Sequence, residues 1–400
     1  MYYNFYIVSK KSLVAIVLII LISGCKTPQV SEQILKAVDS ITFKYVPDSR
    51  EGICDVNLTS MKDKKLVIRG ETNFPDAKDA ILNYLTESGI EYLDSLQVIP
   101  DTDDIDKPWG LVSVSVCNIR KEPSHSSELV SQAIMGNPVK ILKERGSWLL
   151  VQTPDHYIGW AGSSGIKELS DKELAVWKES DRLIYIARSG DILSEKDGGG
   201  VVSDIVSGAI LKLVASQRDF YIVEMPDSRR GRINSSESQV FSKWCSEIKP
   251  EADKLIRFAK SLTGSPYLWG GTSSKMADCS GFVKTVYFTG GVILARDASQ
   301  QFRYGTEIDI SSSINVLKPG DLLFFGHINN QGKKIITHTG MYIGDTEIIH
   351  DSGMIKVNSL DPTRSNYSCS LMESLMGARR IIGTSSGKGI EHVELHEWYN

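Results

Sequence analysis

The sequence predicts an α+β protein made of several small domains. At 400 residues, with 41% hydrophobic and 24% charged residues, the chain is long enough for two to four domains with ordinary cores. A gap-free internal repeat with an offset of 72 residues predicts two small β-barrels in tandem in the middle of the chain. Helical patterns around a cysteine, followed by three strand patterns with two histidines, predict a separate domain after residue 250.

The first 25 residues have the pattern of an export signal and are excluded from the fold. Lys10 and Lys11 precede an apolar run over 12–22, and small residues precede Cys25. This run is too short to span a bilayer, which needs ~20 residues. The ending resembles a bacterial lipoprotein signal, and it predicts that cleavage leaves Cys25 as the lipidated N-terminus of an exported, membrane-anchored protein. A plain secretory signal with an incidental cysteine is the alternative.

Residues 26–108 are predicted to form a small α+β module that begins with a polar linker. Helical periodicity over 34–43 and 76–88 alternates with strand patterns over 53–58, 66–70 and 96–99. The acidic stretch 101–104 is interpreted as the exit loop. The sequence assigns no chemistry to this module.

The two predicted barrels occupy 109–170 and 171–247. The first copy contains Asn118-Ile119-Arg120 and ends in Gly159-Trp160, and these motifs resemble the bacterial SH3 (SH3b) family. The second copy keeps the spacing but has Arg229 in place of Tyr157 and Arg232 in place of Trp160. We therefore expect the second barrel to be a spacer, whereas the first keeps an aromatic rim that could touch a ligand.

The candidate nucleophile is Cys279, which follows Asp278 and opens a helical pattern over 280–292. At a helix N-terminus, unpaired backbone N–H groups and the macrodipole favour a thiolate, and a neighbouring imidazolium would lower the thiol pKa further. The same N–H groups can stabilise an oxyanion during acyl transfer. This position predicts a reactive cysteine rather than a structural one.

Two histidines follow in strand patterns, with His338 in the run 335–344 and His350 in the run 347–351. A hairpin between these runs, with its turn at 344–346, would place the two imidazoles side by side. His338 could then serve as the base for Cys279, and His350 could orient its ring.

Several motifs in this part of the chain resemble the NlpC/P60 peptidase family. They are Tyr267-x-Trp269-Gly270-Gly271, Asp278-Cys279-Ser280-Gly281, Leu317-x-Pro319-Gly320-Asp321, and His338-x-Gly340-x-Tyr342-x-Gly344 with His350. The resemblance covers about 252–382 of a predicted domain at 250–385, and it implies a papain-like α+β fold. It also implies a cysteine peptidase acting on bacterial cell-wall peptides, with Cys279 as nucleophile, His338 as base, His350 as the third polar member and no cofactor or metal.

Together with the two barrels, the arrangement is similar to the γ-D-glutamyl-diamino-acid endopeptidase branch, whose members remove L-Ala-D-Glu from muropeptides with a free N-terminal L-alanine. In that branch an acidic residue and a tyrosine of the first barrel enclose the substrate ammonium, with the aspartate before the cysteine. The resemblance implies these roles for Glu122, Tyr157 and Asp278. The substrate-binding candidates on the catalytic domain are Trp269, Ser280, Arg296, Asp297 and Ser299. Of these, Ser280 and the loop 296–299 are candidates to bind the D-glutamate α-carboxylate, and a structural ion pair is the alternative for Arg296.

Two other functions stay open. One is an endopeptidase that cuts intact peptidoglycan with the first barrel anchored to the wall, and the other is a wall-binding lipoprotein without activity. The sequence does not distinguish meso-diaminopimelate from lysine in the substrate. A formal net charge of -4 and the lack of a basic stripe argue against a nucleic-acid partner, and a monomer is expected.

The remaining cysteines are Cys54, Cys117, Cys245 and Cys369, and none has C-x-x-C spacing. A zinc site is therefore not predicted. One disulfide among them is possible, although scattered cysteines are more often small buried hydrophobes. Residues 386–400 are interpreted as a polar tail.

Overall fold

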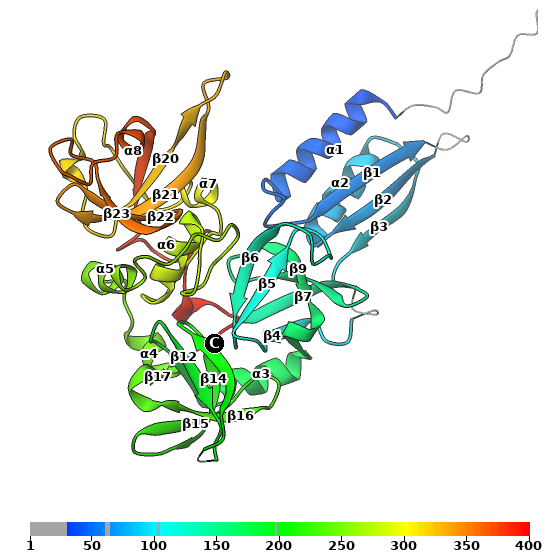
Figure 1. Ribbon diagram of the computed structural model, residues 1–400. Helices are drawn as coiled ribbons and strands as arrows, with labels where there is room; N and C mark the ends of the chain where they lie inside the picture. The colour runs from blue at the N-terminus through cyan, green and yellow to red at the C-terminus, as the bar shows by residue number, and fades with distance from the viewer. Residues whose placement is uncertain (1–29, 61–64, 102–104, 197) are drawn as a thin grey trace, which may run out of the picture.

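The computed structural model describes residues 30–60, 65–101, 105–196 and 198–400. The predicted export signal, Cys25 and most of the acidic stretch 101–104 lie outside the described residues. The fold is α+β, and Figure 1 shows four parts in chain order: an N-terminal module, two barrels and a C-terminal domain. Among the helices described, none is both long and apolar enough to cross a membrane.

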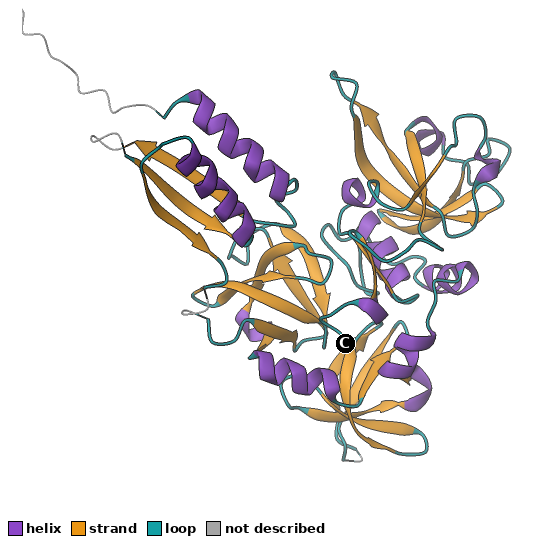
Figure 2. Cartoon of the chain, turned by 180° about the vertical axis from the view of Figure 1, so that it is seen from behind, coloured by secondary structure: helices purple, strands orange, loops and turns teal. Residues whose placement is uncertain are grey.

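The N-terminal module is a three-stranded sheet covered by two helices. It contains α1 (Glu32–Tyr45), β1 (Cys54–Ser60), β2 (Leu66–Thr72), α2 (Pro75–Glu87) and β3 (Tyr92–Val98). Strand β2 pairs with β1 antiparallel and with β3 parallel. Both helices lie on one face of the sheet, and Val38 and Ile81 pack there against Ile68 (Figure 2). Strand β3 begins earlier than the predicted strand at 96–99. The sequence did not reveal its first half, because that half is mostly exposed and shows no apolar alternation.

The two barrels have the same topology, as the repeat predicts. The first is built from β4 (Trp109–Val112), β5 (Val116–Arg120), β6 (Leu129–Ile134), β7 (Pro138–Arg145), β8 (Trp148–Gln152), β9 (Ile158–Gly162) and β10 (Ile166–Leu169). The second is built from β11 (Arg182–Tyr185), β12 (Ser189–Leu193), β13 (Val201–Val206), β14 (Ile210–Ser216), β15 (Phe220–Glu224), β16 (Arg230–Asn234) and β17 (Ser238–Val240). The strand orders β10-β4-β7-β8-β9-β5-β6 and β17-β11-β14-β15-β16-β12-β13 correspond strand for strand. A helix follows each barrel, α3 (Asp171–Glu179) and α4 (Phe241–Glu247).

The C-terminal domain is a six-stranded antiparallel sheet packed against helices. Its sheet order is β19 (Thr306–Ile308), β24 (Leu375–Arg380), β20 (Leu322–Ile328), β21 (Lys334–Gly344), β22 (Glu347–Ser352) and β23 (Met354–Ser359). Helices α5 (Ala252–Ser261) and α6 (Cys279–Phe288) share one core with the sheet, where Phe282 and Val286 contact strand residues such as Met341. Short helices α7 (Ala298–Gln301) and α8 (Cys369–Glu373) complete the domain. Helix α6 ends earlier than predicted because Gly291, with φ of 77°, turns the chain into β18 (Val292–Leu294).

The segment 386–400 is not the polar tail that the sequence suggested. Strand β25 (Ile390–His392) within it pairs with β18, and Tyr399 is 1% exposed in a core with Phe241 and Trp244 of the second barrel's helix. Trp398 packs edge-on against Trp109 of the first barrel, with ring centroids 5.2 Å apart. Figure 1 places the C-terminus between the barrels and the C-terminal domain. A few large apolar side chains are sufficient to bury a segment that is polar on average.

All five cysteines that the structure describes are free thiols. Cys117 and Cys245 are buried, and burial raises the pKa of the Cys117 thiol to about 12. These two residues therefore act as small core hydrophobes.

Candidate active site

Cys279 is the first residue of α6, and Asp278 is the N-cap of that helix. The Asp278 backbone is extended, and its Oδ1 accepts a hydrogen bond of 2.7 Å from the N–H of Gly281. Gly281 has no space for a side chain, because a Cβ there would lie 1.9 Å from the carbonyl oxygen of Gly271. The cap and this close contact fix the start of the helix, and with it the position of the thiol.

The Asp278 carboxylate is fully engaged by buried donors. Arg296 forms a two-pronged pair with it, Nη1 to Oδ1 at 3.1 Å and Nη2 to Oδ2 at 2.6 Å. The N–H of Gly270 and the hydroxyl of Ser280 each donate to it at 3.0 Å. Arg296 is 1% exposed, so its ion pair with Asp278 is buried. Of the two roles that the sequence left open for Arg296, the structure agrees with the structural ion pair. Asp278 therefore has little remaining capacity to receive a substrate ammonium, contrary to expectation.

The Ser280 hydroxyl is also committed within this network. Its Oγ accepts from Arg296 Nη1 at 3.0 Å, and its proton points to Asp278 Oδ1. A hydroxyl has only one proton to donate. In this arrangement Ser280 cannot at the same time donate to a substrate carboxylate.

The resting thiol is neutral, whereas the sequence suggested a thiolate. Burial raises the pKa of Cys279 to about 12, and the negative charge of Asp278 acts in the same direction. Backbone N–H groups of Thr339 and Ser280 oppose this shift but do not reverse it. Burial also lowers the pKa of His338 to about 3, helped by the nearby His350. Desolvation of a 6% exposed thiol outweighs the helix N-terminus, so the pair rests as thiol and imidazole.

The two histidines lie on neighbouring strands, as the predicted hairpin requires. His350 stands opposite Gly340 in the β21–β22 register, and His338 Nε2 lies 2.8 Å from His350 Nδ1. On the far side, His350 Nε2 lies 3.0 Å from Asn358 Oδ1 on β23. Thr339, next to His338, brings its backbone N–H to the Cys279 thiol, so this strand borders the candidate nucleophile.

Asn358 fixes the proton positions along this chain of hydrogen bonds. Its amide Nδ2 donates to the carbonyl of Asn366 at 3.0 Å, which leaves Oδ1 to accept from His350 Nε2–H. His350 Nδ1 is then an acceptor for Nε2–H of His338. His338 Nδ1 consequently carries a lone pair, which is the form that a general base requires.

A cleft of about 400 Å³ opens at Cys279 and has walls from three parts of the chain. The catalytic domain contributes Tyr267, Trp269, Gly270, Asp278, Ser280, Arg296, Asp297, Ala298, Ser299, Ile336 and Thr337. Barrel one contributes Glu128, Val130 and Tyr157, and the N-terminal module contributes Arg50. The charged side chains in this lining leave one negative charge in excess.

The acidic residue of the first barrel at this cleft is Glu128, and the assignment of Glu122 is corrected. Glu122 is exposed at a turn and does not line the cleft, whereas Glu128 Oε1 accepts a 2.9 Å hydrogen bond from Trp269 Nε1. Motif spacing placed the acid at Glu122, two residues after Arg120, but the loop continues towards β6 before it reaches the catalytic domain. Tyr157 does line the cleft, and burial raises its pKa above the usual range, so its phenol stays neutral and can accept a hydrogen bond as well as donate one.

Sequence reasoning missed three residues of this site: Arg50, Glu128 and Asn358. Arg50 Nη1 donates to Asp297 Oδ2 at 2.7 Å, which joins the N-terminal module to the catalytic domain. Nothing in the sequence near Arg50 marks it, because its partner lies 247 residues away. Asn358 was recoverable in principle, since it lies on the strand that follows His350.

This fold and site define a cysteine peptidase of the papain-like α+β type carrying SH3-like barrels. Residues 264–376 match the NlpC/P60 family, and residues 114–167 match the bacterial SH3 domain. The chain therefore contains an NlpC/P60 cysteine peptidase domain and a bacterial SH3 domain, as the motifs predicted.

Two curated relatives are similar over most of their length. The chain is 29% identical over 268 residues to a γ-D-glutamyl-L-lysine dipeptidyl-peptidase of Bacillus cereus, covering 65% of this chain and 77% of the relative. It is 28% identical over 269 residues to dipeptidyl-peptidase 6 of Lysinibacillus sphaericus, covering 64% and 94%. These relatives are peptidases, in agreement with the enzyme class assigned here.

Solved structures show the same fold. An NlpC/P60 family protein from Bacillus cereus superposes with a TM-score of 0.59 at 23% identity, over 68% of this chain and 99% of that chain. An NlpC/P60 endopeptidase from Photobacterium damselae gives a TM-score of 0.51 at 14% identity, over 85% and 81%. An NlpC/P60 domain together with a bacterial SH3 domain is typical of cell-wall hydrolases. This combination indicates an extracytoplasmic location for the protein.

Proposed function

We propose that this protein releases L-Ala-D-Glu from cell-wall muropeptides by cutting the bond between γ-D-glutamate and the diamino acid. The observation that carries the proposal is that barrel one closes one side of the catalytic cleft with Glu128, Val130 and Tyr157. A wall at a fixed distance from the nucleophile limits the length of the acyl part of the substrate. This limit is what an enzyme that removes a dipeptide from a free N-terminus requires. The name of the Bacillus cereus relative, a γ-D-glutamyl-L-lysine dipeptidyl-peptidase, supports the same substrate class.

The proposed reaction is acyl transfer through a thioester. Cys279 Sγ attacks the γ-carbonyl carbon of the glutamyl unit while the thiol proton moves to His338 Nδ1. The first N–H groups of α6 have no helical acceptor, and those at Cys279 and Ser280 are the candidate donors to the oxyanion. The diamino-acid amine then leaves with the proton from His338, and water hydrolyses the thioester to release the dipeptide.

Recognition of the free amine is assigned to Glu128 and Tyr157. Arg296 pairs with Asp278 and Arg50 pairs with Asp297, so Glu128 supplies the excess negative charge of the cleft. A substrate whose amine is acetylated brings no compensating charge and leaves this carboxylate without its cation. The proposal therefore requires discrimination against blocked peptides.

The test compares three substrates with the purified enzyme. We expect L-Ala-γ-D-Glu-L-Lys or its diaminopimelate counterpart to be cleaved at least 100-fold faster in kcat/KM than the N-acetylated tripeptide. The Glu128→Gln variant should lose most of this preference, whereas Glu122→Gln, at an exposed position outside the cleft, should keep it. Equal cleavage of blocked peptide, or faster release from intact sacculi, would refute the exopeptidase proposal and favour an endopeptidase.

We also propose that the exported chain is tethered to a bacterial membrane through lipidated Cys25. The support is the signal pattern of the sequence, since that segment lies outside the described residues. A Cys25→Ser chain should move from the membrane fraction to the aqueous fraction on cell lysis.

A further inference from the structure

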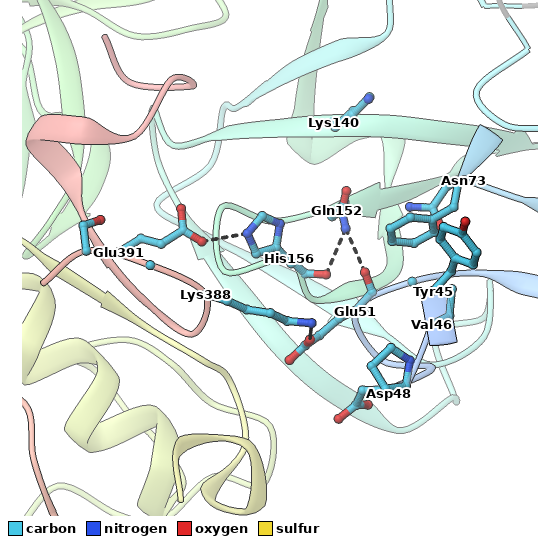
Figure 3. Close-up of a pocket in the computed structure, with 15 residues that line it drawn as sticks. Tyr45, Val46, Asp48, Glu51, Asn73, Lys140, Gln152, His156, Lys388 and Glu391 are labelled. Atoms are coloured by element: carbon cyan, nitrogen blue, oxygen red, sulfur yellow. Dashed lines mark hydrogen bonds and ion pairs between the residues drawn. The ribbon is translucent and has the colours of Figure 1, made fainter. Parts of the chain in front are cut away.

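The loop 48–51 of the N-terminal module is inserted between barrel one and the catalytic domain. The carbonyl of Arg50 accepts from the N–H of Ile158, directly after Tyr157, at 2.8 Å. A cavity of about 590 Å³ lies on the other side of this loop. In it, Gln152 Nε2 donates to the carbonyl oxygens of Glu51 and His156 (Figure 3). Lys388 of the C-terminal segment pairs with Glu51 at 3.3 Å. The loop is therefore held from several sides.

Within this loop, Asp48 fixes the plane of the Arg50 guanidinium. Arg50 Nε and Nη2 donate to the two carboxylate oxygens of Asp48 at 2.8 and 2.7 Å. Asp48 is 8% exposed, and arginine partners lower its pKa to about 2 against the opposing effect of burial, so it stays ionised. The remaining end of the fork, Nη1, points into the catalytic cleft and reaches Asp297 at 2.7 Å and Ser299 Oγ at 3.2 Å.

This contact sets the direction of the Ser299 hydroxyl. Since Oγ accepts from Arg50, the hydroxyl proton is directed away from the guanidinium, and both residues line the cleft. Ser280, the other candidate serine, has its proton committed to Asp278. Of the two serines, Ser299 is therefore the one whose hydroxyl proton is available to a negatively charged group of the substrate. Arg50 itself is ion-paired with Asp48 and Asp297, so it acts on the substrate through this hydroxyl.

We propose that Arg50 of the N-terminal module is a specificity-determining residue, which positions Ser299 to read an anionic group of the substrate. This inference rests on the proposed function, in which that group is the α-carboxylate of the D-glutamyl unit. Arg50 acts through Ser299 and is a positioning residue. The N-terminal module is thus part of the substrate site. The enzyme should cleave a substrate with the carboxylate faster than the same substrate with a neutral amide in its place.

The test is a selectivity ratio measured on two tripeptides, one with the D-glutamyl α-carboxylate and one with the α-carboxamide. For the wild-type enzyme we expect kcat/KM for the acid to exceed that for the amide by roughly tenfold or more. Arg50→Gln and Ser299→Ala should each bring the ratio close to one, mainly through KM for the acid. The Ser299→Ala variant leaves the Asp48–Arg50 pair and the docking of the module intact.

Arg303→Gln is the matched control. Arg303 Nη2 also pairs with Asp48, at 2.9 Å, so its loss weakens the same contact between module and catalytic domain, but Arg303 does not line the cleft. Its ratio should stay at the wild-type value. A ratio that stays unchanged in Arg50→Gln, or that falls equally in Arg303→Gln, overturns the inference while the proposed function stands. Wild-type enzyme that cleaves neither tripeptide overturns the proposed function and the inference with it.

Discussion

The residue after His350 is a buried carboxyl group that we expect to destabilise the protein at neutral and alkaline pH. Asp351 is 0% exposed, and neither of its carboxylate oxygens has a hydrogen-bond partner. Burial raises the pKa of Asp351 from 3.8 to about 7, the charge of Asp278 adds to the rise, and Lys356 opposes it. The native protein therefore holds a proton on Asp351 that the unfolded chain releases near pH 4.

The sign and size of the effect follow from this difference. Between the unfolded and the folded pKa the native state binds more protons than the unfolded chain, so the free energy of unfolding falls as pH rises through this window. At 1.36 kcal/mol per pH unit, the full loss is ~4 kcal/mol above pH 7, of which about 2.5 kcal/mol develops between pH 5 and pH 8. Above pH 8 the loss is nearly complete.

Asp351→Asn removes the titrating group with little change in shape. Relative to wild type, the variant should gain about 2.5 kcal/mol of stability when the pH is raised from 5 to 8. The measurement is hydrogen exchange of the backbone amides of β22 and β23 in urea at the two pH values. Glu122→Gln, at an exposed carboxylate, is the control and should show no such gain. A variant and wild type that keep a constant difference across this pH range would refute the reasoning.

Two further predictions concern positioning and assembly. Asn358→Ala should lower kcat by about 10- to 100-fold with KM little changed, because His350 loses the acceptor that fixes its tautomer. Asn358→Asp keeps an acceptor and should keep most of the activity. Equal losses of kcat in both variants would contradict the tautomer argument. Tyr399→Ala should destabilise the protein by about 3–5 kcal/mol, seen as a lower midpoint of thermal unfolding, because a fully buried ring is removed. Leu395→Ala, at a 70% exposed side chain of the same segment, should leave the midpoint unchanged. A midpoint that falls equally in Leu395→Ala and Tyr399→Ala would show that the packing of the Tyr399 ring is not the cause.

The elements that depend on local pattern could be predicted from the sequence. The repeat offset identified both barrels because each strand of a barrel is set by its own alternation and turn residues. Two strand patterns and the turn at Gly344 predicted the hairpin that brings His338 Nε2 to within 2.8 Å of His350 Nδ1. Recognition of the family likewise depended on short motifs that occur in order along the chain.

Contacts between distant segments could not be predicted in this way. The choice between Glu122 and Glu128 depends on how the loop before β6 meets Trp269, a contact over 141 residues. The state of Cys279 was inferred from its helix N-terminus, a local feature, but burial by the surrounding domain decides its pKa. These two assignments failed because the deciding contact came from a part of the molecule remote in sequence.

The catalytic cleft is therefore a property of the whole assembly rather than of one domain. The proposed nucleophile Cys279 and the proposed base His338 lie on α6 and β21. The walls of the cleft include Tyr157 from a barrel and Arg50 from the N-terminal module. The C-terminal segment packs against both barrels and pairs with β18, which follows α6 by a short turn. A change that loosens any of these interfaces displaces a wall without touching the nucleophile. Such a change should thus alter which peptides are accepted before it abolishes the acyl-transfer chemistry.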